Sequence, residues 1–187
     1  MSSEADADAD ESTLRQALQG ANVVVCDPPW RYGRTAASNG WRGSARRHYA
    51  GMSEQELAAM PVRDCVAADA VVLVWATNAK LPEAIRVMEA WGFSYRTVLV
   101  TWVKTTAAAN GDLALGLGKY TRSSQEHLLL GVRGRVSGLL GTDRAVPGVL
   151  LAPRGRHSEK PQGARALVDR VFAGPGARKR VELFARG

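Results

Sequence analysis

Features that mark several protein classes are missing from this sequence of 187 residues. Only two cysteines are present, Cys26 and Cys65, and both lie in apolar surroundings, so neither a disulfide framework nor a zinc site is supported. No apolar run approaches the about 18 residues of a membrane span, and the N-terminus lacks the basic and then apolar pattern of a signal peptide. We expect a cytoplasmic protein with buried free thiols and no membrane contact.

Negative charge is concentrated at the N-terminus. Residues 1–12 contain five acidic residues and no lysine or arginine, so removing these five charges turns the formal charge of +7 into +12 for residues 13–187. A basic body suits a polyanionic partner, and attraction to phosphates weakens with salt. An arginine-rich genome would produce the same excess, and both explanations stay open here. We expect residues 1–12 to form a disordered acidic tail.

Residues 13–187 have the composition and length of one folded domain. The chain is 45% hydrophobic and 23% charged, which is typical of a globular protein with one substantial core. The sequence predicts helices at about 14–18, 53–60, 79–90 and 162–172, and strands at about 22–26, 71–75, 95–103, 125–132, 146–151 and 180–185. Six strands with helices between them predict a single α/β domain.

Local patterns define several of these elements. Ser53 followed by Glu56 is a capping-box signature for a short helix. The unbroken apolar run 71–75 predicts a strand that is buried on both faces, as in a parallel sheet. Thr77 and Asn78 are candidate caps for the helix that follows this strand, and Trp91 falls on the core face of that helix.

The first strand stops abruptly at Asp27-Pro28-Pro29-Trp30. The prolines lack an N–H group and restrict the residue before them, so this backbone should be stiff. A carboxylate and a backbone carbonyl are thereby held at the carboxyl end of a strand, which is where open α/β sheets bind ligands.

This arrangement suits a planar aromatic amine. The Asp27 carboxylate and the Pro28 carbonyl can each accept one amine hydrogen, and both contacts strengthen as the nitrogen gains positive charge. Trp30 offers a face on which a base can stack. From these residues alone, a Pro-Pro turn with a helix-capping aspartate is the open alternative.

Asp27–Trp30 resembles the catalytic motif of the MT-A70 family of adenine N6-methyltransferases, which use S-adenosylmethionine. Other blocks resemble that family in its order, at 49–53, 73–77, 91–93, 101–105, 125–127, 131–134, 157–161 and 182–186, and together they cover roughly residues 19–186. The resemblance implies a Rossmann-like methyltransferase sheet in permuted order, with the catalytic motif early and the cofactor-binding blocks late.

The resemblance also implies roles for particular residues. The catalytic set is Asp27, Pro28, Pro29 and Trp30. The cofactor set is Asp27, Ser158, Lys160, Glu182 and Arg186, in which the lysine holds the methionyl carboxylate and Glu182 the ribose hydroxyls. The set expected to bind substrate or nucleic acid is Arg31, Arg34, Arg46, Arg47, Tyr49, Lys104 and Glu126. No metal is expected, because the sulfonium methyl group is already activated.

Two segments rich in glycine are candidate loops at the site. Residues 31–48 carry five arginines, Trp41 and no acidic residue, which suits a flipped base and its flanking phosphates or, alternatively, a solvated loop. Residues 105–119 are expected to form a flexible flap.

The resembling family continues beyond the last block with an aromatic and asparagine-rich segment over the cofactor adenine, whereas this sequence ends at Gly187. A lost chain end, weak cofactor binding and completion by another subunit all stay open, and a homo- or hetero-oligomer is therefore considered. Besides an adenine N6-methyltransferase acting on DNA or RNA, the sequence allows a non-catalytic nucleic-acid-binding partner or an amino-methyltransferase acting on a nucleoside or small molecule.

Overall fold

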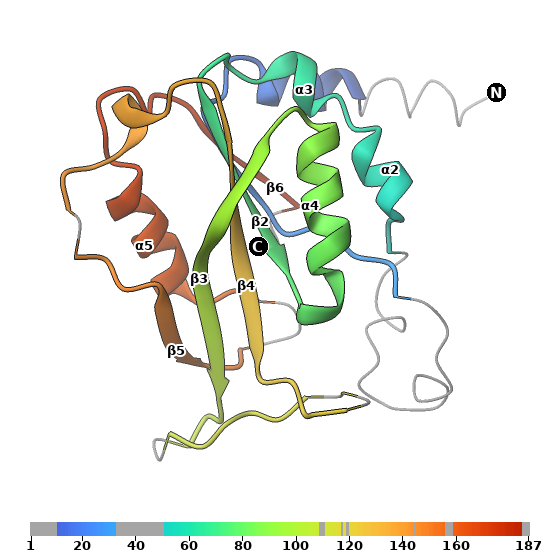
Figure 1. Ribbon diagram of the computed structural model, residues 1–187, viewed down its shortest axis with the longest axis vertical. Helices are drawn as coiled ribbons and strands as arrows, with labels where there is room; N and C mark the ends of the chain where they lie inside the picture. Colours follow the sequence, from blue (N-terminus) through green and yellow to red (C-terminus); the bar gives the residue numbers. More distant parts are fainter. Residues whose placement is uncertain are drawn as a thin grey trace.

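The computed structural model describes residues 11–32, 51–108, 111–116, 118, 120–143, 145–155 and 159–184 (Figure 1). Residues 1–10 and 33–50, which include most of the expected acidic tail and arginine-rich loop, lie outside this part. Residues 11–18 are helical, so Glu11 and Ser12 belong to a helix. That helix ends before Gly20, which has φ +70°, in the left-handed region that favours glycine.

The described chain forms one six-stranded sheet in the order β5-β3-β4-β2-β1-β6. The strands are β1 (Val23–Cys26), β2 (Ala70–Ala76), β3 (Ser94–Thr105), β4 (Gln125–Arg133), β5 (Val149–Pro153) and β6 (Arg180–Leu183). The helices are α2 (Glu54–Ala58), α3 (Val62–Cys65), α4 (Leu81–Ala90) and α5 (Gln162–Val171), with short 3₁₀ turns at Asn78–Lys80 and Ser137–Leu139. The expected single-domain α/β architecture is confirmed. Within the described ranges, no helix is both long enough and apolar enough to cross a membrane.

The sheet is mixed. β1 runs parallel to β2 and to β6, and β3 runs parallel to β5, whereas β4 is antiparallel to both of its neighbours. A parallel pair needs a long crossover connection, usually a helix. No helix is present in the described part of the connection between β3 and β4, and β4 accordingly returns antiparallel to β3.

Both faces of the sheet are covered. Every residue of β2 is buried, as the sequence predicted. Val72, Val74 and Ala76 pack in one core with Met88 of α4 and with Trp91, which follows that helix. The alternate residues of β2 pack in a second core with α5, since side chains of successive strand residues point to opposite faces. In Figure 1, α4 and α5 flank the sheet.

Several local predictions are confirmed. The capping box is present: the Ser53 N–H donates to Glu56 Oε2 at 2.6 Å, and the Glu56 N–H donates to Ser53 Oγ at 3.2 Å. Trp91 is fully buried, and its indole N–H donates to the Leu57 carbonyl at 2.8 Å. Cys26 and Cys65 are buried free thiols.

Three predictions about the elements were wrong. Thr77 and Asn78 form no side-chain cap, because both side chains bond to other residues instead. β3 continues to Thr105, since Lys104 and Thr105 pair with β5. β5 begins at Val149 rather than at residue 146, and its partner on β3 fixes the start, which apolarity alone does not reveal.

Candidate active site

The sheet topology brings distant parts of the sequence to one edge. The parallel strands β1, β2, β3, β5 and β6 all end there, and the antiparallel strand β4 begins there. Asp27, at the end of β1, therefore lies at the same edge as Lys104 near the end of β3 and Glu126 near the start of β4. Residue types that the sequence offers far apart can thus form one site.

Hydrogen bonds from the backbone and from the Trp30 side chain hold the Asp-Pro-Pro-Trp segment in place. The Asp27 N–H donates to the Leu183 carbonyl at 3.2 Å, and the Trp30 N–H donates to the Pro28 carbonyl at 2.8 Å. The Trp30 indole N–H donates to the Trp75 carbonyl at 3.0 Å, and the ring packs against the core on the α4 side. The segment is therefore fixed to β2 as well as to β6.

Residue 51 must be glycine for a second segment to pack on this motif. Met52 donates its N–H to the Pro29 carbonyl at 2.7 Å, and its own carbonyl accepts from the Arg31 N–H at 2.8 Å. A Cβ atom at Gly51 would lie 2.8 Å from the Arg31 Cα, a contact that real Cβ atoms do not make. The close approach of two backbones explains this glycine.

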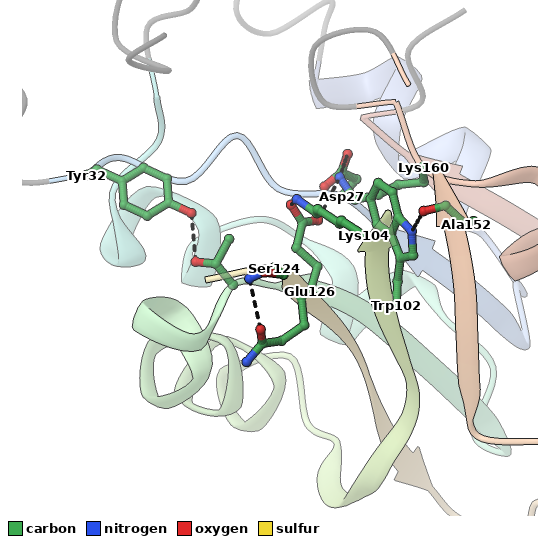
Figure 2. Close-up of polar contacts among 10 residues, drawn as sticks. Asp27, Tyr32, Trp102, Lys104, Ser124, Glu126, Ala152 and Lys160 are labelled. Carbon is green, nitrogen blue, oxygen red and sulfur yellow. Dashed lines mark hydrogen bonds and ion pairs between the residues drawn. The ribbon is translucent and has the colours of Figure 1, made fainter. Parts of the chain in front are cut away.

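Four charged side chains of alternating sign meet beside the motif (Figure 2). Lys160 Nζ lies 2.7 Å from Asp27 Oδ2 and 3.4 Å from Glu126 Oε2, and Lys104 Nζ lies 2.5 Å from Glu126 Oε1. All four side chains are largely buried, with exposed fractions of 15–22%. We call Asp27, Lys104, Glu126 and Lys160 the charge cluster.

Two buried tryptophans support the lysines of the charge cluster. Lys104 Nζ lies 4.8 Å from the ring centroid of Trp102, and Lys160 Nζ lies 5.6 Å from that of Trp75. The two rings meet edge to face, with centroids 6.4 Å apart and an angle of 81° between the planes. The Trp102 indole N–H donates to the Ala152 carbonyl at 3.0 Å, which fixes this ring. Each ammonium group is thus attracted by a carboxylate and by an aromatic face.

The charge cluster keeps Glu126 ionised. Burial acts to raise the pKa of Glu126, but the positive charges of Lys160 and Lys104 outweigh it and lower the pKa below its ordinary value. Glu126 is consequently favoured as the carboxylate that contacts both lysines.

A cleft of about 310 Å³ opens next to the cluster. Asp27, Lys160 and Glu182 line it together with apolar side chains from β1, β2, β4 and α5. Glu182 accepts from the Arg165 guanidinium at 2.5 Å. Phe184 also lines the cleft and has φ +60°, a left-handed conformation that is uncommon for a bulky residue. The lining offers the Lys160 ammonium group for an anionic part of a ligand and the Glu182 carboxylate for hydroxyl groups.

Tyr32 was not among the predicted site residues, although it lies two residues after the motif. Its hydroxyl bonds to Thr77 Oγ1 at 2.9 Å, and Lys80 Nζ lies 5.3 Å from its ring centroid. Burial raises the pKa of Tyr32. An aromatic residue so soon after Asp-Pro-Pro-Trp was the one signal that could have identified it.

His127 lies next to Glu126 but takes part in a different set of contacts. Its Nε2 lies 2.8 Å from Asn78 Oδ1 and its Nδ1 lies 3.1 Å from Thr101 Oγ1. An amide oxygen only accepts, so Nε2 carries the proton and Nδ1 accepts from the threonine. Burial lowers the pKa of His127, which favours this neutral form.

The structure thus brings the charge cluster and Glu182 together, and Pro28, Pro29 and Trp30 directly follow Asp27 of the cluster. Arg31 is exposed and pairs with Glu56 at 3.0 Å. The other predicted positions, Arg34, Arg46, Arg47, Tyr49, Ser158 and Arg186, lie outside the described residues. In the part of the chain that can be described, no three histidine, cysteine, aspartate or glutamate side chains gather as a metal site would require.

Comparison with known proteins identifies relatives of this chain. The type II methyltransferase M.MunI of Mycoplasma sp. is 30% identical over 178 residues, covering 88% of this chain and 71% of that protein. An Arabidopsis thaliana N(6)-adenosine-methyltransferase MT-A70-like protein is 28% identical, and the human N(6)-adenosine-methyltransferase catalytic subunit METTL3 is 26% identical. Both alignments cover 88% of this chain, but only 21% and 25% of those longer proteins. The MT-A70 family model matches residues 21–187. The chain therefore belongs to the MT-A70 family.

Proposed function

We propose that this protein transfers a methyl group from S-adenosylmethionine to the N6 amine of adenine in nucleic acid. The observation that carries the proposal is the contact between Asp27 and Lys160 at the mouth of the cleft. This contact places the Asp27 carboxylate, which suits an amine, next to the Lys160 ammonium group, which suits a carboxylate. Family membership and the names of the relatives support the same reaction.

The residues that line the cleft fit this cofactor. Lys160 presents a cation for its carboxylate, and Glu182 presents oxygen atoms for its ribose hydroxyls. Val25, Trp75 and Leu128 contribute apolar surface to the same cleft. When bound, S-adenosylmethionine supplies an activated methyl group, so the protein needs to contribute only position and electrostatics.

The chain's own residues then act on the amine. The Asp27 carboxylate accepts one N–H, and the Pro28 carbonyl, which has a second lone pair besides the one engaged by Trp30, accepts the other. Both acceptors stabilise the positive charge that develops on nitrogen during transfer. The bond from Trp30 to Trp75 holds the motif in place while this happens.

Nucleic acid as the substrate is supported by the basic body of the chain and by the relatives named as adenosine methyltransferases. METTL3 is named a catalytic subunit, and this name supports assembly of the present chain with a second chain. The buried free thiols are compatible with the expected cytoplasmic location.

The test is label transfer from methyl-labelled S-adenosylmethionine to DNA and to RNA, with Asp27→Ala as the control. We expect N6-methyladenine in one polymer, identified by mass spectrometry of the digest, and none with the variant. Transfer by a folded Asp27→Ala protein at a near-normal rate would refute the amine contact. Transfer only to free nucleosides would favour the small-molecule alternative, and cofactor-independent nucleic-acid binding without any transfer would favour the non-catalytic one.

A further inference from the structure

Lys160 is shared between two carboxylates. Its ammonium nitrogen lies 2.7 Å from Asp27 and 3.4 Å from Glu126, and the same side chain lines the cleft. A ligand carboxylate in the cleft would be a third anionic partner besides Asp27 and Glu126. The Lys160 ammonium group can exchange one of these partners for another with little movement. The side chain that would hold a ligand carboxylate is therefore the one already bonded to the amine-accepting aspartate.

Glu126 is held where it can keep Lys160 when Asp27 is released. Lys104 fixes the other oxygen of Glu126 at 2.5 Å, and the Lys104 backbone N–H is itself bonded to the Ser124 carbonyl at 2.6 Å. The face of the Trp102 ring also attracts the Lys104 ammonium group. Loss of the Asp27 contact therefore does not leave Lys160 without a carboxylate neighbour.

The Asp27–Lys160 pair opposes binding of an amine at Asp27. A carboxylate that already accepts from an ammonium is a weaker acceptor for a second N–H group. The lysine charge also disfavours positive charge on a nearby nitrogen. A ligand carboxylate that draws Lys160 into the cleft removes both effects.

We propose that Lys160 couples the two halves of the site: a ligand carboxylate in the cleft draws Lys160 from Asp27, and Asp27 then accepts the N–H of the substrate amine. Glu126, braced by Lys104, is a positioning residue that acts through Lys160. This inference rests on the proposed function. By thermodynamic linkage, the carboxylate tightens binding of the amine and the amine tightens binding of the carboxylate by the same factor.

The experiment measures oligonucleotide affinity with and without a saturating cofactor product. One single-stranded oligonucleotide carries one adenine, and its matched partner carries purine, which lacks the amine, at that position. The ligands are S-adenosylhomocysteine and its 3-aminopropyl analogue, which lacks only the carboxylate. We expect S-adenosylhomocysteine to tighten binding of the adenine oligonucleotide about tenfold, and the other three combinations to show no tightening.

Two variants separate coupling from a merely structural role, because their expected effects have opposite signs. Without any cofactor, Lys160→Met should raise the preference for adenine over purine, since Asp27 no longer bonds to lysine. Glu126→Gln should lower this preference, since the Glu126 charge then no longer draws Lys160 away from Asp27. If Glu126 instead contacted the nucleic acid directly, Glu126→Gln would change the affinity of both oligonucleotides by the same factor.

Equal tightening by the two ligands, or equal tightening of the two oligonucleotides, would overturn the inference. So would absence of tightening when both ligand and oligonucleotide bind. If N6-methyladenine is formed but no coupling is seen, only this inference fails. If neither polymer is methylated, the proposed function fails and the inference fails with it.

Discussion

At the residue scale, Glu126 decides how the charge cluster responds to pH. Its pKa is lowered in the folded protein, so its contribution to stability is fully present above the pKa of the unfolded chain and is lost as pH falls through the lower, folded pKa. Protonation leaves Lys104 and Lys160 with a single carboxylate, Asp27, in the cluster.

We predict that Glu126→Gln lowers the free energy of unfolding by about 2–3 kcal/mol at pH 7, because two largely buried lysines lose a counter-charge. Urea unfolding measures the difference, which should stay constant from pH 7 down to the ordinary glutamate pKa of 4.5 and shrink as pH falls below it. The control is Glu54→Gln, which breaks an exposed pair with Arg86 and should cost less than about 1 kcal/mol. A difference that is constant with pH would contradict the role of the Glu126 charge.

A second prediction at this scale concerns the cofactor. Lys160→Ala should raise the dissociation constant of S-adenosylmethionine about tenfold or more, because one charge-assisted contact to its carboxylate is lost. Calorimetric titration of the folded variant measures this change. Binding that stays unchanged would remove Lys160 from the cofactor site, and equal loss of nucleic-acid affinity would indicate a general defect.

At the element scale, the motif after β1 depends on the segment that packs on it. Backbone bonds join Met52 to Pro29 and to Arg31, and this approach is possible only because residue 51 has no Cβ. The position of Asp27 is therefore set partly by a segment 24 residues further along the chain.

We predict that Gly51→Ala lowers methyl transfer at least about tenfold, since a misplacement of about 1 Å is costly in a positioned site. Gly138→Ala is the matched control, because a Cβ there has nothing within 4 Å. Circular dichroism would verify that both variants fold before rates are compared. A Gly51→Ala protein with the wild-type rate would show that the close backbone approach does not matter for transfer.

Much of the fold could be predicted from sequence patterns. Capping by Ser53 and burial of the β2 run follow from local chemistry, and both were predicted correctly. The end of β3 could not be predicted, because the pairing of Lys104 with β5 is non-local and two polar residues after an apolar run look like a loop. The caps expected at Thr77 and Asn78 failed for the same reason: Tyr32 and His127, distant in sequence, take their side chains.

The site was predictable as a set of residues but not as a network. A carboxylate at a strand end and a late lysine can be recognised by type and by resemblance to a family. That Glu126 bridges two lysines depends on β4 running antiparallel, which brings its start to the functional edge. The lack of a helical pattern in residues 106–124 favours an antiparallel return, but the contacts of Glu126 with the two lysines are long-range and no local pattern reveals them.

At the scale of the whole molecule, the net positive charge of the chain should make binding of a nucleic acid depend on salt, whereas binding of a small neutral substrate should not. We predict that raising salt from 50 to 200 mM weakens binding of a single-stranded oligonucleotide at least about tenfold, the change expected for about three phosphate contacts. Fluorescence anisotropy measures this dependence. Free adenosine is the control and should show almost none. An oligonucleotide whose affinity ignores salt would favour the small-molecule alternative.

The antiparallel return of β4 has a consequence for how such a protein can diversify. The chain between β3 and β4 leaves and re-enters the sheet at the edge that carries the charge cluster, with Leu113 bridged to Thr105 beside it. Lengthening, shortening or exchanging this excursion reshapes the rim of the site while the strand registers and the cluster stay as they are. New target preferences can therefore arise by grafting one peptide segment, without rebuilding the machinery beneath it.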